Sequence, residues 1–427
     1  MNYTRLMNYL WRAGQMRSID FVAVTGESVA VVSEGEGADD VSGVWTAAEV
    51  VVDGERRRGT VAVGASVPVP DGAVLRVVED FAPPVLGTDD RLVPQIVCPP
   101  PSEAAICHDA LVAGAGNAAC AGRVAAMLPP YRTSLLSALL VDRLRRKTER
   151  IGEIFGSAAQ DWNQTFHVLL MQAMGGDRNR DAFTSLAGRA TAAMVAREKN
   201  SVTRVEALLL GSAGFLFGGR GADTKDDYTL ALEEEARHLL AKYSIVPMRP
   251  AEWNLAKLYP ANHPAVRLAE IAAMLSKKDF MLDGVLDCRT SEDVERLFSA
   301  TASDYWRTHY TPSGGASAPS AKTIGRAKAR LVGINLVAPL VFAYGRATGG
   351  EELCERALDL LTDIPAEKNR LLEGWYAGGC EAGSAFESQA LLQLTSEYCA
   401  KGACADCRIG RTEIKNALAH KTYANNE

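Results

Sequence analysis

The sequence lacks the features that mark secreted and membrane proteins. Its first residues, MNYTRLMNYLWRAG, have arginines among the apolar positions, so no secretory signal is expected. The longest apolar run, LVGINLVAPLVFAYG at 331–345, is too short to span a bilayer, and we interpret it as a buried helix. The nine cysteines of the 427-residue chain are irregularly spaced, which argues against a disulfide framework. We therefore expect a cytoplasmic protein without membrane contacts.

Other common signatures are also missing. No internal repeat of fixed period is found, so a solenoid is not expected. The glycine-rich segment 208–221 lacks the Gly-Lys-Ser/Thr ending of a phosphate loop, and its glycines are interpreted as close helix packing. The net charge is -6, and residues 1–100 carry it, with 8 Lys/Arg against 14 Asp/Glu. This part of the chain disfavours a polyanion, whereas local basic patches elsewhere could still bind one.

What the chain does contain predicts an α+β protein. Residues 1–100 predict a small mixed α/β domain, with a first helix from Tyr3 to Ala13 and about five short, valine-rich strands. Residues 101–130 are expected to form a connector. From 131 to 427 the apolar residues recur at helical spacing, which predicts a large helical domain that ends in a cysteine-rich loop.

That loop, YCAKGACADCRIG, places Cys399, Cys404 and Cys407 within nine residues. A Cys-x2-Cys turn allows two thiolates to face one ion, as in structural zinc sites. The spacing Cys-x4-Cys-x2-Cys also matches the first three ligands of plant-type iron–sulfur ferredoxins. A fourth ligand is needed, and Cys380 is the preferred candidate, with His420 as another. The alternative interpretation is a set of reduced, partly buried thiols.

Two segments in the helical part carry charge that a ligand could use. The segment LYPANHPAVR, residues 258–267, contains Asn262, which is predicted to cap the next helix. Arg267 follows one turn later, and pairing with a carboxylate is the preferred interpretation. The alternative is that Asn262 and Arg267 contact an anion or a partner. The basic segment RLRRKTER at 143–150 is interpreted as a solvated helix face, with a phosphate-contacting helix as the alternative.

Several segments together resemble a widespread bacterial family with a domain of unknown function, numbered twenty-eight fifty-one. The segments are VEALLLGSAGFL (205–216), PANHPAVRLAEIA (260–272), YWRTHY (305–310), INLVAPLVFAYG (334–345), PAEKNRLLEGW (365–375) and SQALLQLTSEYCAKGACADCRIG (388–410). The resemblance extends over nearly the whole chain and implies no established activity.

The resemblance also implies a comparison in the N-terminal part. Family members usually carry an aspartate on one strand and a glutamate followed by a histidine on a neighbouring strand, similar to the metal site of restriction-type nucleases. This chain has Val44, Ala62 and Gly64 at those three positions. Since Mg²⁺ sites depend on one or two protein carboxylates, the resemblance implies a nuclease-like sheet whose acidic site is lost.

We therefore expect a non-catalytic binding protein whose helical domain contacts nucleic acid or a partner protein. Two alternatives stay open. One is a metal-dependent hydrolase that uses the residual acids Glu36, Asp40 and Glu49. The other is a structural protein with zinc or an iron–sulfur cluster at its C-terminal cysteines.

Overall fold

The computed structural model describes residues 3–17, 19–37, 42–87, 90–116, 118–217, 225–277 and 282–424. The protein is α+β, with an N-terminal mixed sheet followed by a large helical region, as the sequence predicts. The chain divides into two compact units. Unit 1 comprises residues 1–135, 369–381 and 391–427, and unit 2 comprises residues 136–368 and 382–390.

The sheet of unit 1 has the strand order β1-β2-β4-β5-β6-β7, and the short strand β3 pairs with β4. The first pairings are antiparallel, whereas β5, β6 and β7 run parallel to one another. The N–H of Val24 donates to the carbonyl of Gln95 at 2.8 Å, which brings the two outer strands together and almost closes the sheet into a barrel. The strands are β1 (Asp20–Val22), β2 (Ser28–Ser33), β3 (Glu36–Gly37), β4 (Val44–Val52), β5 (Glu55–Val63), β6 (Ala73–Val78) and β7 (Gln95–Val97).

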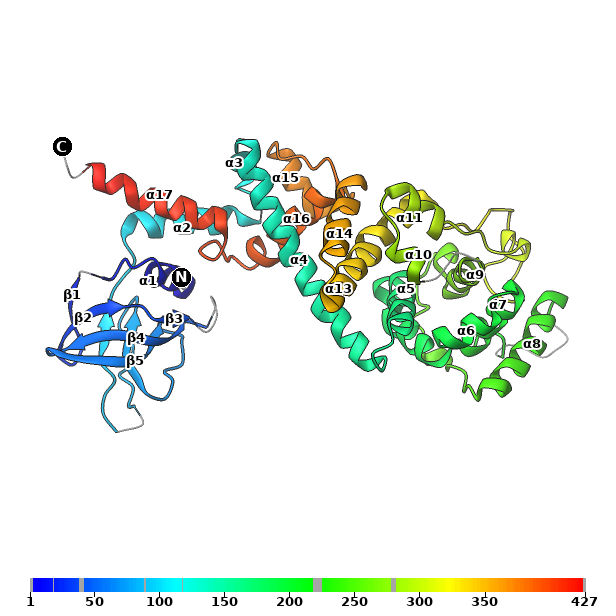
Figure 1. Ribbon diagram of the computed structural model, residues 1–427, viewed down its shortest axis with the longest axis horizontal. Helices are drawn as coiled ribbons and strands as arrows, with labels where there is room; N and C mark the ends of the chain where they lie inside the picture. The colour runs from blue at the N-terminus through cyan, green and yellow to red at the C-terminus, as the bar shows by residue number, and fades with distance from the viewer. Residues whose placement is uncertain are drawn as a thin grey trace. The chain divides into compact units, whose positions relative to one another are not determined.

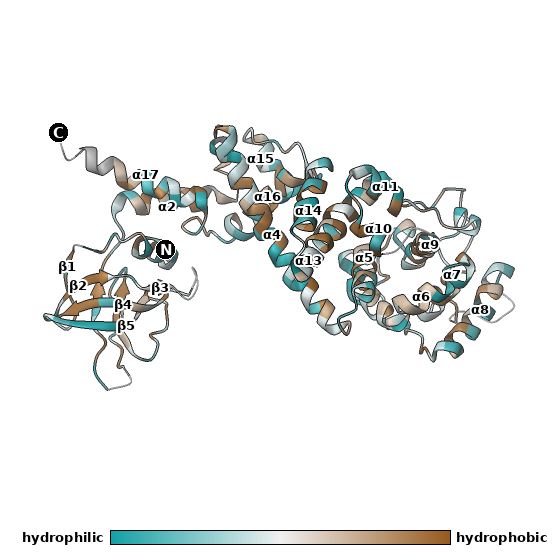
Figure 2. Ribbon diagram, in the orientation of Figure 1, coloured by the Kyte–Doolittle hydropathy of each residue, from teal (hydrophilic) through white to brown (hydrophobic). Residues whose placement is uncertain are grey.

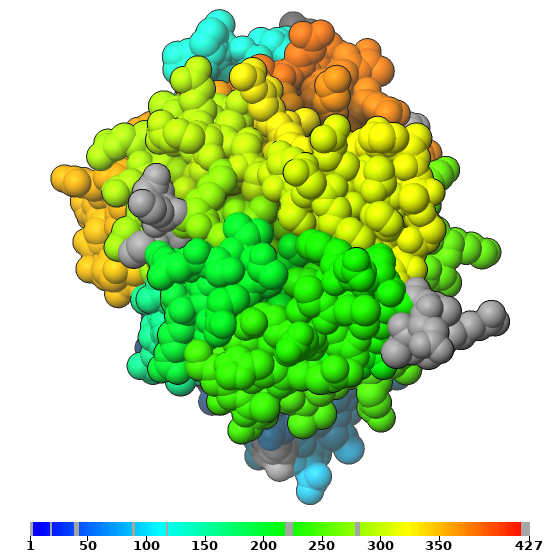
Figure 3. Space-filling model, turned by 90° about the vertical axis from the view of Figure 1, so that its right-hand side faces the viewer, coloured from blue at the N-terminus to red at the C-terminus, as the bar shows by residue number. Residues whose placement is uncertain are grey.

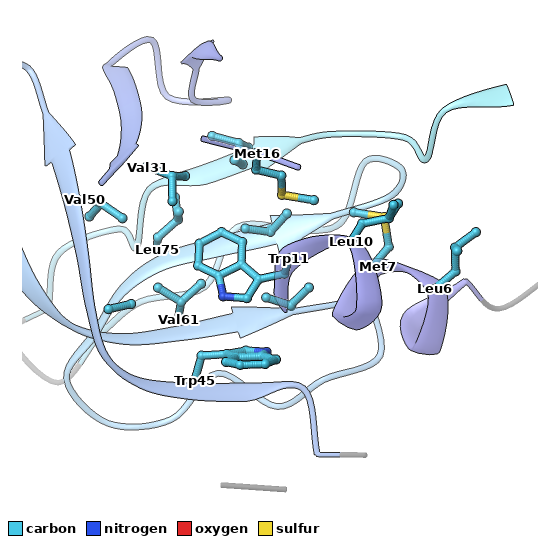
Figure 4. Close-up of a cluster of buried hydrophobic side chains, with 14 of the residues drawn as sticks. Leu6, Met7, Leu10, Trp11, Met16, Val31, Trp45, Val50, Val61 and Leu75 are labelled. Atoms are coloured by element: carbon cyan, nitrogen blue, oxygen red, sulfur yellow. The ribbon is translucent and has the colours of Figure 1, made fainter. Parts of the chain in front are cut away.

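Helix α1 (Thr4–Arg12) covers this sheet because its apolar residues share one face. Leu6, Met7, Leu10 and Trp11 are fully buried, at the i, i+3, i+4 spacing of an amphipathic helix. Figure 4 shows Trp11 between the helix and the strands that carry Val31, Val61 and Leu75. The Trp11 indole N–H donates to the carbonyl of Glu34 at 3.1 Å, so the buried ring keeps a hydrogen-bond partner.

Unit 1 also contains helices from both ends of the chain. Helix α17 lies alongside α2, which Figure 1 shows as red and cyan ribbons. The ion pair between Arg123 and Glu413, at 3.2 Å, joins α3 to α17. The helical elements are α2 (Ser102–Ala115), α3 (Ala121–Ala125), η6 (Arg370–Leu372), α15 (Glu373–Ala377), the π-helical turn η7 (Thr395–Cys399) and α17 (Arg408–Ala424).

The regular elements among the described residues of unit 2 are helices, joined by loops. Figure 3 shows one face of it, where green residues before 245 lie against yellow residues after 300; there the Tyr228 hydroxyl lies 2.9 Å from the Ser303 hydroxyl. Helices α4 (Pro129–Ser157) and α16 (Ala385–Leu394) have residues in both units. The other elements are α5 (Trp162–Arg189), α6 (Ala192–Glu198), α7 (Val202–Ser212), α8 (Asp227–Tyr243), η2 (Pro250–Glu252), η3 (Pro260–Asn262), α9 (Pro264–Leu275), α10 (Leu282–Leu286), α11 (Ser291–Phe298), η4 (Asp304–Arg307), α12 (Arg326–Val332), η5 (Gly333–Val337), α13 (Ala338–Thr348) and α14 (Glu351–Asp363).

The apolar run at 331–345 belongs to one continuous helical segment formed by α12, η5 and α13. By length and composition, the 23 residues Arg326–Thr348 could cross a membrane, but 67% of their most apolar window is buried inside the protein. Figure 2 shows brown, apolar residues in this segment and in the strands, whereas β5 begins with teal, polar residues. The segment is therefore packed as the core helix of a folded protein.

The expected elements and the observed ones agree over most of the chain. Each of the five valine-rich segments contains a strand, and Asp53 and Gly54 form the turn between β4 and β5. Helices α2 and α17 were not predicted. Residues 391–427, which include the cysteine loop, belong to the compact unit that holds the sheet.

Candidate functional site

A break in α5 forms the centre of a basic cleft of unit 2. Gly176 has φ 59° and ψ -169°, and Asn179 is also non-helical, so the helix stops and restarts inside its own length. Two hollows of about 600 and 470 Å³ meet at this break and share Gly176, Asp177 and Lys328 in their walls. They form one cleft, which we call the α5 cleft.

The charge of the α5 cleft is opposite in sign to that of the whole protein. Its lining contains seven basic side chains but only two acidic ones, Asp177 and Glu367, whereas the chain has a net charge of -6. Arg150 and Lys257 are exposed, and neither has an acidic partner among the described residues. The basic residues are Lys147, Arg150, Arg178, Arg180, Lys257, Arg267 and Lys328.

Two of these lysines lie in environments that disfavour their positive charge. Burial, together with the nearby charges of Arg143 and Arg146, lowers the pKa of Lys147 to about 7, and Glu367 opposes this shift only in part. Its ammonium donates to the amide oxygen of Asn335 at 3.2 Å. Burial and the Arg267 charge likewise lower the pKa of Lys328 to about 8. An anion bound beside these groups would offset both penalties.

Arg267 is held in place at the other side of the cleft. It donates to the buried carboxylate of Glu270 at 2.7 Å and to the side-chain oxygen of Asn262 at 3.0 Å. The prediction that Asn262 caps the next helix is wrong, because the His263 side chain accepts from the Ala265 N–H at the start of α9. The side-chain oxygen of Asn262 accepts a hydrogen bond from the Arg267 guanidinium and does not cap α9.

An aromatic ring stands at the edge of the same cleft. Tyr259 lines it beside Lys257, and 81% of the tyrosine surface is exposed. A tyrosine so exposed contributes little to the core. Its face can stack against a flat ligand that enters between the basic side chains.

The N-terminal strands place the three positions of the nuclease comparison close together. Val44 on β4 is paired directly with Ala62 on β5. Ala62 is fully buried, and Gly64 has φ +116° and touches Thr4, where a Cβ would approach to 2.7 Å. Neither paired position therefore offers an oxygen ligand to a cation.

The residual acids have other surroundings. Glu49 forms an ion pair with Arg56 at 3.5 Å, and Glu36 is exposed on the short strand β3. Asp40 lies outside the described residues. Their use in a hydrolase stays a prediction.

The three C-terminal cysteines share one buried pocket with a fourth cysteine from a distant part of the chain. Cys399 ends the η7 turn, Cys407 precedes α17, and Cys120 precedes α3. Burial, and to a smaller extent the nearby thiols of Cys407, Cys120 and Cys404, raises the pKa of Cys399 to about 12. The pocket leaves about 20 Å³ of free space, and its walls are Leu111, Ala115, Ala119, Cys120, Trp375, Leu394, Tyr398, Cys399, Cys404, Cys407, Ile409 and Gly410.

Cys380, the fourth ligand expected from the sequence, is not in the wall of this pocket. It is fully buried, and its N–H donates to the carbonyl of Trp375 at 2.9 Å. The side chain of His420 lies outside the described part of the chain. Among the described residues, no three His, Cys, Asp or Glu side chains are already as close together as a metal ion requires.

Sequence reasoning missed the cleft because its walls come from separate segments. Lys147 and Arg150 belong to RLRRKTER, which we interpreted mainly as a solvated face, although they line the cleft. Lys328 lies in no motif or charged run that singled it out in the sequence. Cys120 lies within a small-residue segment, AGAGNAACAG, and only the fold brings it to the C-terminal cysteines.

Comparison with known proteins covers four of the six segments singled out in the sequence and part of a fifth, whereas the segment 388–410 lies outside the match. No curated protein and no solved structure matches the chain. The model of one family, described as "Protein of unknown function (DUF2851)", matches residues 70–370. The match begins after β4 and β5 and ends before the cysteine loop, and it includes the whole α5 cleft. Because it covers well over half of the sequence, the chain belongs to the DUF2851 family of proteins of unknown function.

Proposed function

We propose that the helical unit binds single-stranded nucleic acid in the α5 cleft, without cleaving it. The observation that carries this proposal is the gathering of seven basic side chains in one cleft of a protein whose net charge is -6. Like charges repel, so such a group costs stability unless an anion neutralises it. A phosphodiester backbone supplies anions at regular intervals along the cleft.

The exposed tyrosine favours a single strand over a duplex. Proteins that bind single strands combine a basic groove with aromatic side chains on which unpaired bases stack. Tyr259 stands beside Lys257 with most of its ring exposed, so both features occur at the same edge of the cleft. The bases of a duplex are stacked on one another and would leave this ring without a partner.

The acidic groups of the cleft do not remove its positive character. Asp177 is paired with Arg180 at 3.0 Å and is almost fully exposed. Glu270 lies beneath the surface, where it binds Arg267 and Lys328 and holds them in position. Lys147, Arg150 and Lys257 are left to contact a ligand.

The proposal is tested by fluorescence anisotropy with labelled single-stranded and duplex oligonucleotides at low salt. The single strand should bind more tightly, and Tyr259→Ala should weaken its binding by about 1–3 kcal/mol, the usual contribution of one stacked base. Tyr259→Phe keeps the ring and should bind as the wild type does. The double variant Arg150→Ala/Lys257→Ala should also weaken binding.

The control is Arg197→Ala, which removes an exposed arginine of α6 that does not line the cleft. Equal loss in Arg197→Ala and in the cleft variant would contradict the proposal, since it would indicate a diffuse charge effect. Equal competition by polyglutamate would indicate an acidic protein as the partner. Release of shortened oligonucleotide in the presence of Mg²⁺ would contradict a role without cleavage.

A further inference from the structure

We propose that Cys120, Cys399, Cys404 and Cys407 together bind a thiophilic metal, either zinc or the iron of an iron–sulfur cluster. This inference concerns unit 1 and does not depend on the proposed function of unit 2. Four thiolates complete the ligand set of a closed structural site. The same number holds an iron–sulfur cluster.

The geometry that supports this site comes from three separate segments. The pocket is bounded by sulfurs from the start of α3, the end of η7 and the loop before α17. Its free space of about 20 Å³ holds about one water-sized object. The rest of the pocket wall is mostly apolar, and the Cys120 thiol lies beside the Arg123 side chain.

The loop between the cysteines is fixed from outside the pocket. Asp406, between Cys404 and Cys407, forms an ion pair with Arg5 of α1. The Arg411 side chain donates to the carbonyl of Ala405 at 2.9 Å. A loop with fixed backbone positions holds its sulfurs ready for a metal, which lowers the entropy lost on binding.

Two further details concern the backbone around Cys407. The backbone N–H groups of Ile409 and Gly410 face its sulfur. Gly410 also lies against the carbonyl of Cys404, where a Cβ would approach to 2.0 Å, so only glycine allows this close turn. Metal ligands are commonly supported by such outer hydrogen bonds.

The inference is tested on the purified, full-length protein by elemental analysis, sulfide analysis and visible absorption. Zinc near one equivalent supports a single-ion site, and iron with sulfide supports a cluster. Cys120→Ser should reduce metal affinity at least about tenfold, an effect at least as large as that of losing an outer-shell partner. Cys380→Ser and Cys354→Ser should bind metal as the wild type does.

A second measurement uses only the wild-type protein, so its result does not depend on the folding of the serine variants. Thiol alkylation with peptide mapping should show that metal protects Cys120, Cys399, Cys404 and Cys407, with no change at Cys354. The inference is overturned if neither zinc nor iron with sulfide is retained or taken up. It is also overturned if Cys380, rather than Cys120, is protected, or if the four cysteines are recovered as disulfides that exclude metal.

Discussion

The residue whose surroundings say most about the cleft is Lys147. Burial and the neighbouring Arg143 and Arg146 lower its pKa to about 7, and only Glu367 acts in the opposite direction. The folded state binds the proton of Lys147 less tightly than the unfolded state does. Charged Lys147 therefore lowers the free energy of unfolding. As far as this group is concerned, stability rises with pH between about 7 and its ordinary pKa near 10.5, where the unfolded chain binds the additional proton. A bound phosphate would reverse the imbalance by stabilising the charged ammonium.

Oligonucleotide affinity is therefore expected to fall as the pH rises from 6 to 9. Phosphate diesters stay charged over this range, so the change reflects loss of the lysine protons, first from Lys147 and then from Lys328, whose pKa is lowered to about 8. Lys147→Arg keeps its charge over the whole range and should show a smaller fall. Anisotropy titrations at constant ionic strength measure this, and identical pH profiles for the two proteins would contradict a role for Lys147.

At the scale of the element, the break in α5 decides the shape of the cleft. The backbone at Gly176 adopts φ 59° and ψ -169°, a conformation that is essentially restricted to glycine. An added Cβ would meet no neighbouring atom within 4 Å, so the requirement for glycine comes from the backbone alone. The glycine thus lets one helix supply walls to both halves of the cleft.

Gly176→Ala should destabilise the protein by about 1–3 kcal/mol and weaken oligonucleotide binding, because the backbone must distort or the helix must straighten. Gly188→Ala lies in the same helix, in regular helical structure and with open space around it, and should stabilise by about 0.4–1 kcal/mol. Chemical denaturation followed by circular dichroism compares the two. Similar effects of both substitutions would show that the break has no special backbone requirement.

The sequence predicted elements better than it predicted the positions where elements meet. The strands of 28–33 and 44–63 lie in valine-rich segments, and the helical spacing after residue 131 corresponds to helices such as α8 and α9. Helix α2 was hidden in a segment with few large apolar residues, where the periodic signal is weak.

The whole molecule shows why the candidate sites could not be assembled from the sequence. Unit 1 is discontinuous, since residues 391–427 pack with the N-terminal sheet rather than with the preceding helices of unit 2. Cys120 and Cys399 therefore line the same pocket although they are 279 positions apart in the sequence. No local spacing of residues indicates this proximity. The α5 cleft likewise draws on α4, α5, α9 and α12. The net charge of -6 gives no indication that the chain forms a basic cleft.

The most direct measurement of the central claim is the salt dependence of oligonucleotide binding by the wild type and by Arg150→Ala/Lys257→Ala. For single strands, the logarithm of affinity falls against the logarithm of salt concentration with a slope of about -0.7 for each phosphate neutralised. If both side chains contact phosphates, the double variant should have a slope shallower by about 1.4. No measurable binding by the wild type at low salt, or the same slope in both proteins, would contradict binding in the α5 cleft.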